Sequence, residues 1–418
     1  MLTASVQAAD GCAVARIGAV GGSMTAADDG RRVRDRRGSI AMCALVALVA
    51  LAGCAGTSDP AAAPSPTPVT PAEGSVPATA AEVLAGIAEL GLGEAELIAY
   101  LRERAASEGP VTLYTISGAE DTQAWVEVFR TEFPEVDLRF VALGNDEVVE
   151  RVTAEARAGR QVVDVIQSTA PPLAALINEG LLAPHSGALV PEGLPERYVG
   201  THEVTHRIAP VVIPRFASVP AEDAPQGWDD FLEPEHAGCV FSVAPTWVTA
   251  LVDERGEDGA AAWFEGFLAN GGTMAQSSGA QLRRLLAGEI DCVVQSNAHT
   301  LRRLVVEDGA PLDWVIPTRS YATATSVAVH RDTPRTHAAA LVALWLASPS
   351  GAQVIADLGD LPTHPDVMLT DERLRPWLDP SSPESQRTAI IDMERSIEVE
   401  QIVFRLIETY VTPNLIAE

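Results

Sequence analysis

The chain lacks lysine altogether and has few aromatic residues. All 29 basic residues are arginine, aromatic residues make up 5% of the 418 positions, and 57 acidic residues leave a formal net charge of −28. Proteins that bind nucleic acids or anionic membranes need basic surfaces, so this balance argues against both as partners. We interpret the acidic surplus as a solubilising surface.

Sequence motifs of the common enzyme classes are absent as well. The chain contains no GxSxG elbow, no HExxH motif, no Walker-type glycine loop and no CxxC pair. His202 and His206 have the spacing of metal ligands on a helix, but the local pattern is typical of a strand, where they would stand about 13 Å apart. We therefore expect neither an enzyme nor a bound cofactor or metal.

A single long apolar run lies near the N-terminus. Residues 31–39 are strongly basic, residues 40–52 are apolar, and the run ends in Leu51-Ala52-Gly53-Cys54. This order predicts a signal peptide with a lipobox over residues 1–53. Cys54 would then carry a diacylglycerol, and its two acyl chains would anchor the protein to the outer face of the cell membrane. A membrane helix that ends at a chance cysteine is the alternative.

The start of translation and the export route stay open. The leader before Arg31 is long and has no pattern, so Met24 competes with Met1 as the first residue. The pair Arg31-Arg32 hints at twin-arginine export without the residues that usually follow it.

Two segments of different character follow the lipobox. Residues 54–78 are rich in Pro, Ala, Ser and Thr, which favours an extended, solvated tether. Residues 79–108 have apolar positions at helical spacing with a break at Gly91-Leu92-Gly93, which predicts a cap of two short helices.

The remainder alternates strand-like and helix-like segments. We predict strands at Val111–Ile116, Val136–Leu143, Val162–Gln167, Cys239–Val243, Asp291–Gln295, Trp314–Pro317 and Thr323–His330. We predict helices at Asp146–Ala158, Pro172–Glu179, Ala260–Asn270, Gly279–Ala287, Ala298–Glu307, His337–Ala347 and Ser385–Tyr410. Such alternation is typical of an α/β protein with a sheet covered on both faces, and roughly 365 residues after the lipobox favour two lobes.

Two cysteines fall within this α/β region. Cys239 and Cys292 each begin an apolar, strand-like run, whereas Cys12 and Cys43 belong to the leader. Outside the cell the first two could form a disulfide, but sequence alone does not reveal their geometry. A disulfide and two buried free thiols are both compatible with the pattern.

Six phrases in order resemble the ferric-iron-type group of extracellular solute-binding proteins of ABC importers. They are Val111–Ser117, Glu155–Ser168, Glu179–Leu182, Gly227–Pro234, Leu286–Ile290 and Ala347–Gln353. The resemblance implies a two-lobed periplasmic-binding-protein-like fold, in which each lobe is a mostly parallel sheet flanked by helices and the ligand cleft lies at the hinge. The lobes would comprise residues 109–208 (lobe I) and 209–318 (lobe II), with residues 319–418 returning to lobe I and ending in C-terminal helices.

The same resemblance implies a function. A monomeric receptor of this kind captures a small solute between its lobes and delivers it to ABC permease subunits. The alternative is a surface lipoprotein without a transport role, either a solute sensor for a signalling protein or an adhesin.

The expected cleft is built from loops that connect strands to helices. Backbone N–H groups and the positive ends of helix dipoles converge there, which suits an anionic or oxygen-rich ligand. Five hydroxyl residues stand at such junctions and either bind the ligand or merely cap helices. They are Ser117, Ser168, Thr169, Thr246 and Ser296.

The chain departs from the ferric-binding pattern at the expected metal ligands. Ala298 and His299 stand where that group has a tyrosine pair, so tyrosinate coordination of iron is not expected. Thiamine, phosphonates, polyamines and simple anions are the solutes of related proteins, and the sequence does not choose among them. Further candidates for lining the cleft, by ring face or hydrogen bond, are Tyr114, Trp247, Asn297, His299 and Tyr321.

Overall fold

A computed structural model of the chain describes residues 78–391 and 393–416. The predicted signal peptide, the lipidation site at Cys54 and nearly all of the tether over 54–78 lie outside the described residues. No single described helix is long and apolar enough to cross a membrane. One bent pair of helices, α9 (Thr336–Ala347) and α10 (Pro349–Asp357), is long and apolar enough by length and composition alone, with a bend of 56° between the two.

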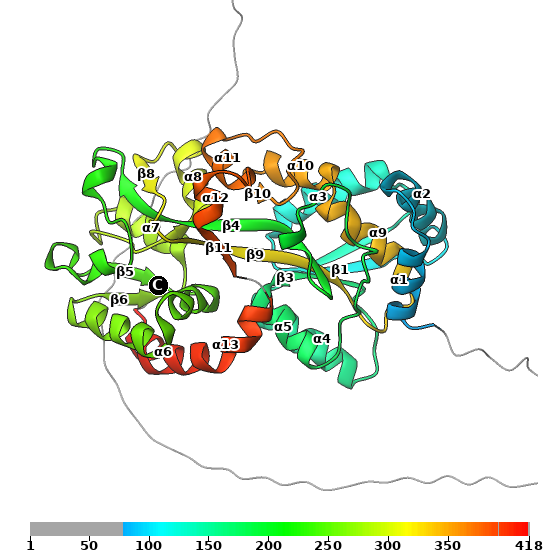
Figure 1. Cartoon of the computed structure of the whole chain (residues 1–418), viewed down its shortest axis with the longest axis horizontal. Helices are drawn as coiled ribbons and strands as arrows, with labels where there is room; N and C mark the ends of the chain where they lie inside the picture. Colours follow the sequence, from blue (N-terminus) through cyan, green and yellow to red (C-terminus); the bar gives the residue numbers. More distant parts are fainter. Residues whose placement is uncertain (1–77, 392, 417–418) are drawn as a thin grey trace, which may run out of the picture. The chain divides into compact units, whose positions relative to one another are not determined.

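The first described helices form the two-helix segment predicted after the tether. Helix α1 (Ala80–Glu89) begins with a capping box, in which the side chains of Thr79 and Glu82 each accept a hydrogen bond from the backbone N–H of the other residue. Helix α2 (Glu94–Ala105) follows the predicted break. Both contact α9 (Thr336–Ala347), a helix that is buried along its whole length. Figure 1 shows this packing at one end of the main sheet.

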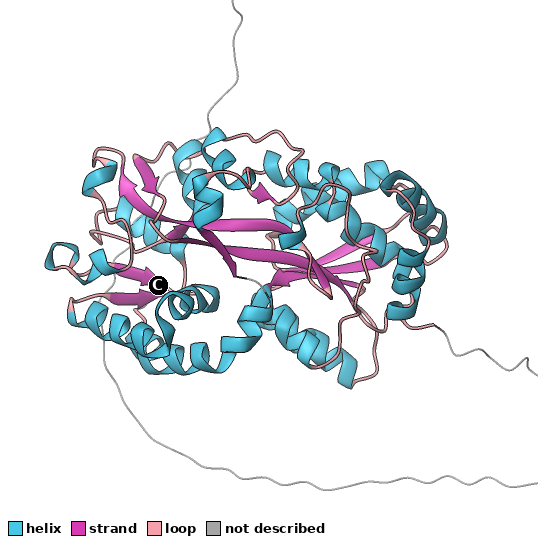
Figure 2. Cartoon of the chain, in the orientation of Figure 1, coloured by secondary structure: helices cyan, strands magenta, loops and turns pink. Residues whose placement is uncertain are grey.

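A mixed sheet forms the backbone of lobe I. In spatial order its strands are β2 (Leu138–Ala142), β1 (Val111–Thr115), β3 (Val165–Thr169), β9 (Ser320–Val329), β4 (Glu203–Phe216) and β10 (Leu361–Pro362). The strands β2, β1 and β3 are parallel, whereas β9, β4 and β10 join as antiparallel neighbours (Figure 2).

Helices cover both faces of this sheet, as the alternation of elements predicts. They are α3 (Ala119–Glu132), α4 (Asn145–Arg157), α5 (Ala170–Asn178), α9 and α10 (Pro349–Asp357). The strand pleat divides β1 between two apolar clusters: Val111 and Leu113 pack with α3 and α9, while Tyr114 packs with α4 and α5. Gly180, with φ 67°, follows the end of α5, which agrees with the predicted helix end at Glu179.

The long strands β4 and β9 continue into lobe II, where the second half of β4 pairs with β7 (Ser296–Asn297) and β8 (Leu312–Val315). The other elements of lobe II are β5 (Val240–Ser242), α6 (Pro245–Ala269), β6 (Thr273–Ala275), α7 (Ser278–Leu286) and α8 (Ala298–Val306). Helix α6 is kinked at Gly256, whose φ of 72° interrupts the helix, and the predicted helix Ala260–Asn270 corresponds to the part after this break.

One predicted strand of lobe II is wrong. Asp291–Gln295 does not form a strand; Val293 makes a single parallel bridge to Val240, and β7 begins only at Ser296. The run is apolar because it is buried beside β5, and burial alone does not supply a ladder of backbone partners.

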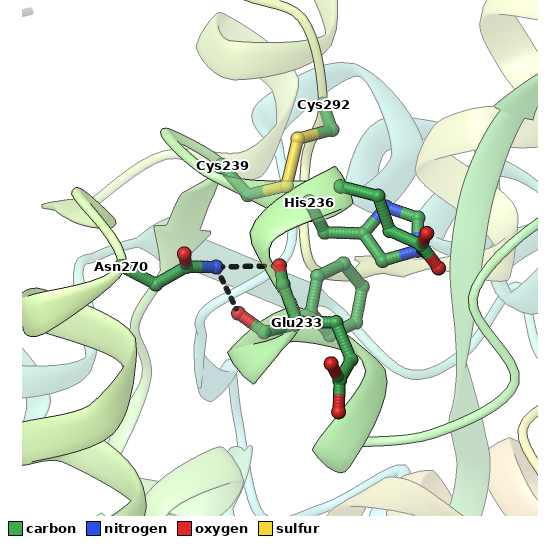
Figure 3. The surroundings of a disulfide bond; sticks show 7 residues. Glu233, His236, Cys239, Asn270 and Cys292 are labelled. Atoms are coloured by element: carbon green, nitrogen blue, oxygen red, sulfur yellow. Dashed lines mark hydrogen bonds and ion pairs between the residues drawn. A yellow bond between two sulfur atoms is a disulfide. The ribbon is translucent and has the colours of Figure 1, made fainter.

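A disulfide joins Cys239 to Cys292 next to that bridge, which decides between the two possibilities that sequence left open. The two Cα atoms are 4.8 Å apart. Figure 3 shows Asn270 beside the bond, where its side-chain amide donates to the backbone oxygens of Phe231 (3.1 Å) and Glu233 (2.8 Å). The bond therefore lies among loops that are also tied by hydrogen bonds.

The C-terminal segment corrects another prediction, the single helix over Ser385–Tyr410. The structure has α11 (Arg375–Leu378), α12 (Pro383–Arg387), β11 (Thr388–Ile391), α13 (Met393–Leu406) and a π-helical turn (Ile407–Val411). The residues of β11 are mostly β-branched, and they pair in parallel with the start of β9. Helix α13 contacts α6 of lobe II and α5 of lobe I, and Figure 1 shows it running between them.

Candidate functional site

A cleft of about 730 Å³ lies between the two lobes. Lobe I contributes the beginning of α4, the end of β3 and the first two turns of α5. Lobe II contributes the beginning of α6, the residue after β6 and the residue before α8, and Thr323 of the hinge strand β9 completes the lining. The walls are Asn145, Asp146, Val149, Glu150, Thr169, Pro171, Pro172, Ala175, Val243, Ala244, Pro245, Thr246, Trp247, Gln276, Asn297 and Thr323.

Four helices begin at this cleft, which is the arrangement expected of strand-to-helix junctions. Helices α4 and α5 start on one wall and α6 and α8 on the other. The cleft thus brings together four of the candidates chosen from sequence, namely Thr169, Thr246, Trp247 and Asn297.

Each of these four residues has a defined neighbour. The Thr169 hydroxyl donates to Asn145 Oδ1 (3.2 Å), and the Thr246 hydroxyl accepts from Thr323 (3.4 Å) across the hinge. The Trp247 ring stacks on Phe241, with centroids 6.4 Å apart and planes 26° apart. Asn297 Oδ1 is buried and has no hydrogen-bond partner among the described residues.

Tyr114 does not line the cleft, contrary to the expectation from sequence. The pleat of β1 directs it into the apolar cluster under α4, where it is fully buried. Its hydroxyl donates to Glu155 Oε1 (2.7 Å), and the Arg151 guanidinium lies 4.8 Å from the ring centroid. Burial, reinforced by Glu155, raises the pKa of Tyr114 to about 12, so the phenol stays protonated.

Ser168 and Ser296 stand next to the cleft but are themselves buried. The Ser168 hydroxyl donates to Asn145 Oδ1 (3.4 Å), and the Ser296 hydroxyl donates to the backbone oxygen of Asn297 (3.3 Å). Both side chains support residues of the cleft lining.

Ser117 and His299 belong to a separate charged cluster around Arg207 and Asp360. Arg207 donates to Asp360 Oδ2 (2.5 Å) and to the Ser117 hydroxyl (3.4 Å), and His299 Nδ1 lies 3.8 Å from Asp360 Oδ1. Desolvation lowers the pKa of His299, against the opposing effect of Asp360. Desolvation is the largest single effect on Asp360 and raises its pKa, but Arg207, His299 and Arg303 together lower that pKa below its usual range.

Neither of these two candidates lines the cleft: Ser117 accepts a hydrogen bond from Arg207, and His299 lies near Asp360. Ala298, which also stands where the ferric-binding group has a tyrosine, is completely buried. The place of the absent tyrosine pair is filled by packing and by the charged cluster.

Tyr321 does not line the cleft and lies beside a different cavity of about 400 Å³. Its hydroxyl donates to Gln295 Oε1, and its ring stacks on Trp228 with centroids 6.1 Å apart. Burial raises the pKa of Tyr321 well above its ordinary value.

Sequence reasoning missed the carboxylates of the cleft. Asp146 and Glu150 are exposed residues on one face of α4, four positions apart, and both line the cleft. The signal was present, because a helix is predicted to begin at Asp146 directly after a sheet strand. Gln276 and Thr323 were missed because no junction motif marks them.

The histidine pair does not form a metal site. His202 precedes β4, and His206 is completely buried on it with Nε2 3.2 Å from Gln167 Nε2. Within residues 78–391 and 393–416, no group of three His, Cys, Asp or Glu side chains is placed to hold a metal ion.

No protein-family model and no curated protein matches the sequence. Solved structures do match. The iron- and citrate-bound IdiA (FutA) of Trichodesmium has a TM-score of 0.60 at 17% identity, covering 72% of this chain and 98% of its own. An ABC transporter substrate-binding protein of Bradyrhizobium japonicum has a TM-score of 0.61 at 17% identity, covering 72% and 99%.

A third match is the periplasmic binding protein AfuA of Actinobacillus pleuropneumoniae with fructose-6-phosphate bound, at a TM-score of 0.58 and 17% identity, covering 73% and 99%. At these identities the likeness establishes the fold. The chain has the two-lobed α/β fold of the periplasmic substrate-binding proteins, so the predicted fold class is confirmed, and the likeness to ferric-iron-type proteins recognised in the sequence recurs in the structure.

Proposed function

We propose that this protein is the solute-binding receptor of an ABC importer, anchored by a lipid on Cys54 to the outer face of the cell membrane. It works as a monomer that captures a small solute between its lobes and presents it to permease subunits. The observation that carries the proposal is the inter-lobe cleft of about 730 Å³, which is lined by helix beginnings from both lobes and by the hinge strand β9. Its volume falls within the range of small-molecule sites.

The matched structures support this proposal in two ways. One is described as an ABC transporter substrate-binding protein, and two hold solutes, iron with citrate in one and fructose-6-phosphate in the other. The same fold therefore accepts different solutes, which agrees with the loss of the tyrosine pair at Ala298 and His299.

A thermal-shift screen of the full chain against small solutes tests the binding role. A solute at 100 times its dissociation constant should stabilise the folded protein by about 2.7 kcal/mol. Ala175→Trp places a bulky ring into the cleft from α5, whereas Ala154→Trp makes the same change on the exposed face of α4 outside the cleft. A cleft ligand should stabilise the Ala154→Trp protein and lose its effect on the Ala175→Trp protein.

Equal stabilisation of both variants would place the solute outside the cleft. If no solute in a library of cations, anions and neutral compounds raised the melting temperature, the receptor function would be refuted. Uptake of an identified solute by cells with and without this gene then tests delivery to a permease.

Metabolic labelling with an alkyne fatty acid tests the anchor. The wild-type protein should be labelled and sediment with membranes, and Cys54→Ala should be unlabelled. Labelling of the Cys54→Ala protein would refute the lipobox prediction.

A further inference from the structure

The cleft has a one-sided charge. Asp146 and Glu150 line it, and its described lining residues include no arginine and no histidine. Both carboxylates are exposed, and neither has an ion-pair or hydrogen-bond partner among the described residues. Two arginines between the lobes have other partners: Arg207 pairs with Asp360, and one nitrogen of Arg303 donates to both carboxylate oxygens of Asp121 (3.0 Å each).

The helix beginnings at the cleft are poor anion sites despite their number. Anion binding at a helix N-terminus needs free backbone N–H groups, and proline has none. Pro171 and Pro172 open α5 and Pro245 opens α6, and all three line the cleft. These residues remove N–H groups that a phosphate or carboxylate would need.

Helix α4 is similarly unsuited to an anion. The Gly144 N–H at its beginning donates to Glu147 Oε2 (2.9 Å), so this donor is already used. Asp146 and Glu147 in the first turn also offset the positive end of the helix dipole.

One polar group of the lining lacks a hydrogen-bond donor. Asn297 belongs to the cleft lining, and its buried Oδ1 is an acceptor without a partner in the described chain. Trp247 adds an aromatic ring, which attracts cations through its face. A ligand with N–H donors and positive charge would satisfy both.

We propose that the captured solute is an organic cation that carries at least one ammonium-type group, recognised by the carboxylates of Asp146 and Glu150. This inference rests on the proposed receptor function, and it replaces the anionic or oxygen-rich solute expected from helix N-termini alone. The cation pairs with the α4 carboxylates, and its N–H groups or its alkyl shell meet Asn297 and Trp247.

Three four-carbon probes that differ in charge test the proposal on the full chain. They are putrescine (two ammonium groups), butane-1,4-diol (neutral) and succinate (two carboxylates), with choline as a second cation. Isothermal titration at pH 7 and low salt should give the highest affinity for the cations and none for succinate. Raising the salt concentration should weaken cation binding, because the carboxylates are exposed.

Variants that remove a charge from α4 test whether the preference for cations depends on its carboxylates. Asp146→Asn and Glu150→Gln should each weaken putrescine binding by about fivefold, the size of a partly exposed ion pair. Glu147→Gln is the matched control: it removes the same charge from the same helix turn, keeps an oxygen for the Gly144 N–H, and lies outside the cleft lining. It should change the affinity by less than about twofold.

Two outcomes would overturn the inference. The first is succinate binding that exceeds putrescine binding and disappears in Ala175→Trp; the receptor function would then stand while the charge assignment fails. The second is no binding of putrescine or choline at 10 mM. If the wider library still yields a neutral or anionic solute that is sensitive to Ala175→Trp, only the inference fails, and if it yields none, the proposed function fails with it.

Discussion

Replacing both Cys239 and Cys292 by alanine should lower the free energy of unfolding by about 4 kcal/mol. The two residues are 53 positions apart in sequence, and a cross-link over a loop of that length removes about 14 cal/mol/K of chain entropy from the unfolded state, or about 4 kcal/mol at 25 °C. In the folded state their neighbourhood is already held by backbone contacts, since the Val240 N–H donates to the Cys292 oxygen (3.0 Å). The bond therefore acts mainly on the unfolded chain.

Urea unfolding followed by far-ultraviolet circular dichroism measures this loss. The wild-type protein under reducing conditions is the control, because it keeps both sulfur atoms and lacks only the bond. Cys239 is completely buried, so the alanine variant also loses some packing and should fall slightly below the reduced protein. A loss of less than about 1 kcal/mol in the reduced protein would refute the entropic argument.

Three further predictions concern buried or paired charges. Asp164 is completely buried and accepts from the backbone, from a threonine and from Arg335 (3.0 Å), so Asp164→Ala should cost about 3–5 kcal/mol in urea unfolding, and a loss below 1 kcal/mol would contradict this. Burial lowers the pKa of His206 to about 3, so between its ordinary pKa of 6.5 and pH 3 the unfolded chain binds a proton that the folded protein does not, and stability falls as the pH falls, by up to about 1.4 kcal/mol per pH unit. His206→Gln should flatten that slope between pH 6 and pH 4, and an unchanged slope would assign the acid sensitivity to other groups. Asp121→Asn removes the ion pair to Arg303 that joins α3 to α8, and it should change stability by less than about 1 kcal/mol. Small-angle scattering of the solute-free variant should show a larger radius of gyration than the wild type, and an unchanged radius would contradict a role of the pair in holding the lobes together.

Much of the fold could be predicted because local signals agree with it. The alternation of apolar runs and amphipathic segments identifies β1, β3, α4 and α5, and Gly180 marks the end of α5 where its positive φ is needed. The strand β11 could not be predicted, because its four residues become a strand only by pairing with β9, which lies more than sixty positions earlier in the chain. Non-local pairing of this kind leaves little trace in a short window of sequence.

The candidate site was predicted in part for a related reason. Junction loops are visible in sequence, so Thr169, Thr246 and Asn297 were found. The depth of a side chain beneath the covering helices is not visible, and Tyr114 was expected to reach the cleft although it is buried under α4 and α5. Likewise, nothing in the sequence reveals that His299 meets Asp360, because the two residues are brought together only by the packing of α8 near the end of α10.

The free carboxylates of α4 acquire a second consequence if the lobes close around the solute. Closure would withdraw Asp146 and Glu150 from water, and burial of an unpaired carboxylate costs several kcal/mol. With no cationic side chain among the described residues of the lining, the protein has no internal counter-charge to offset that cost. An organic cation in the cleft would supply it, so the same two residues that select the charge of the solute would also make closure depend on its presence. If the proposed function and the cation assignment both hold, we predict that small-angle scattering shows a smaller radius of gyration with putrescine than without it, and that Asp146→Asn with Glu150→Gln reduces this difference.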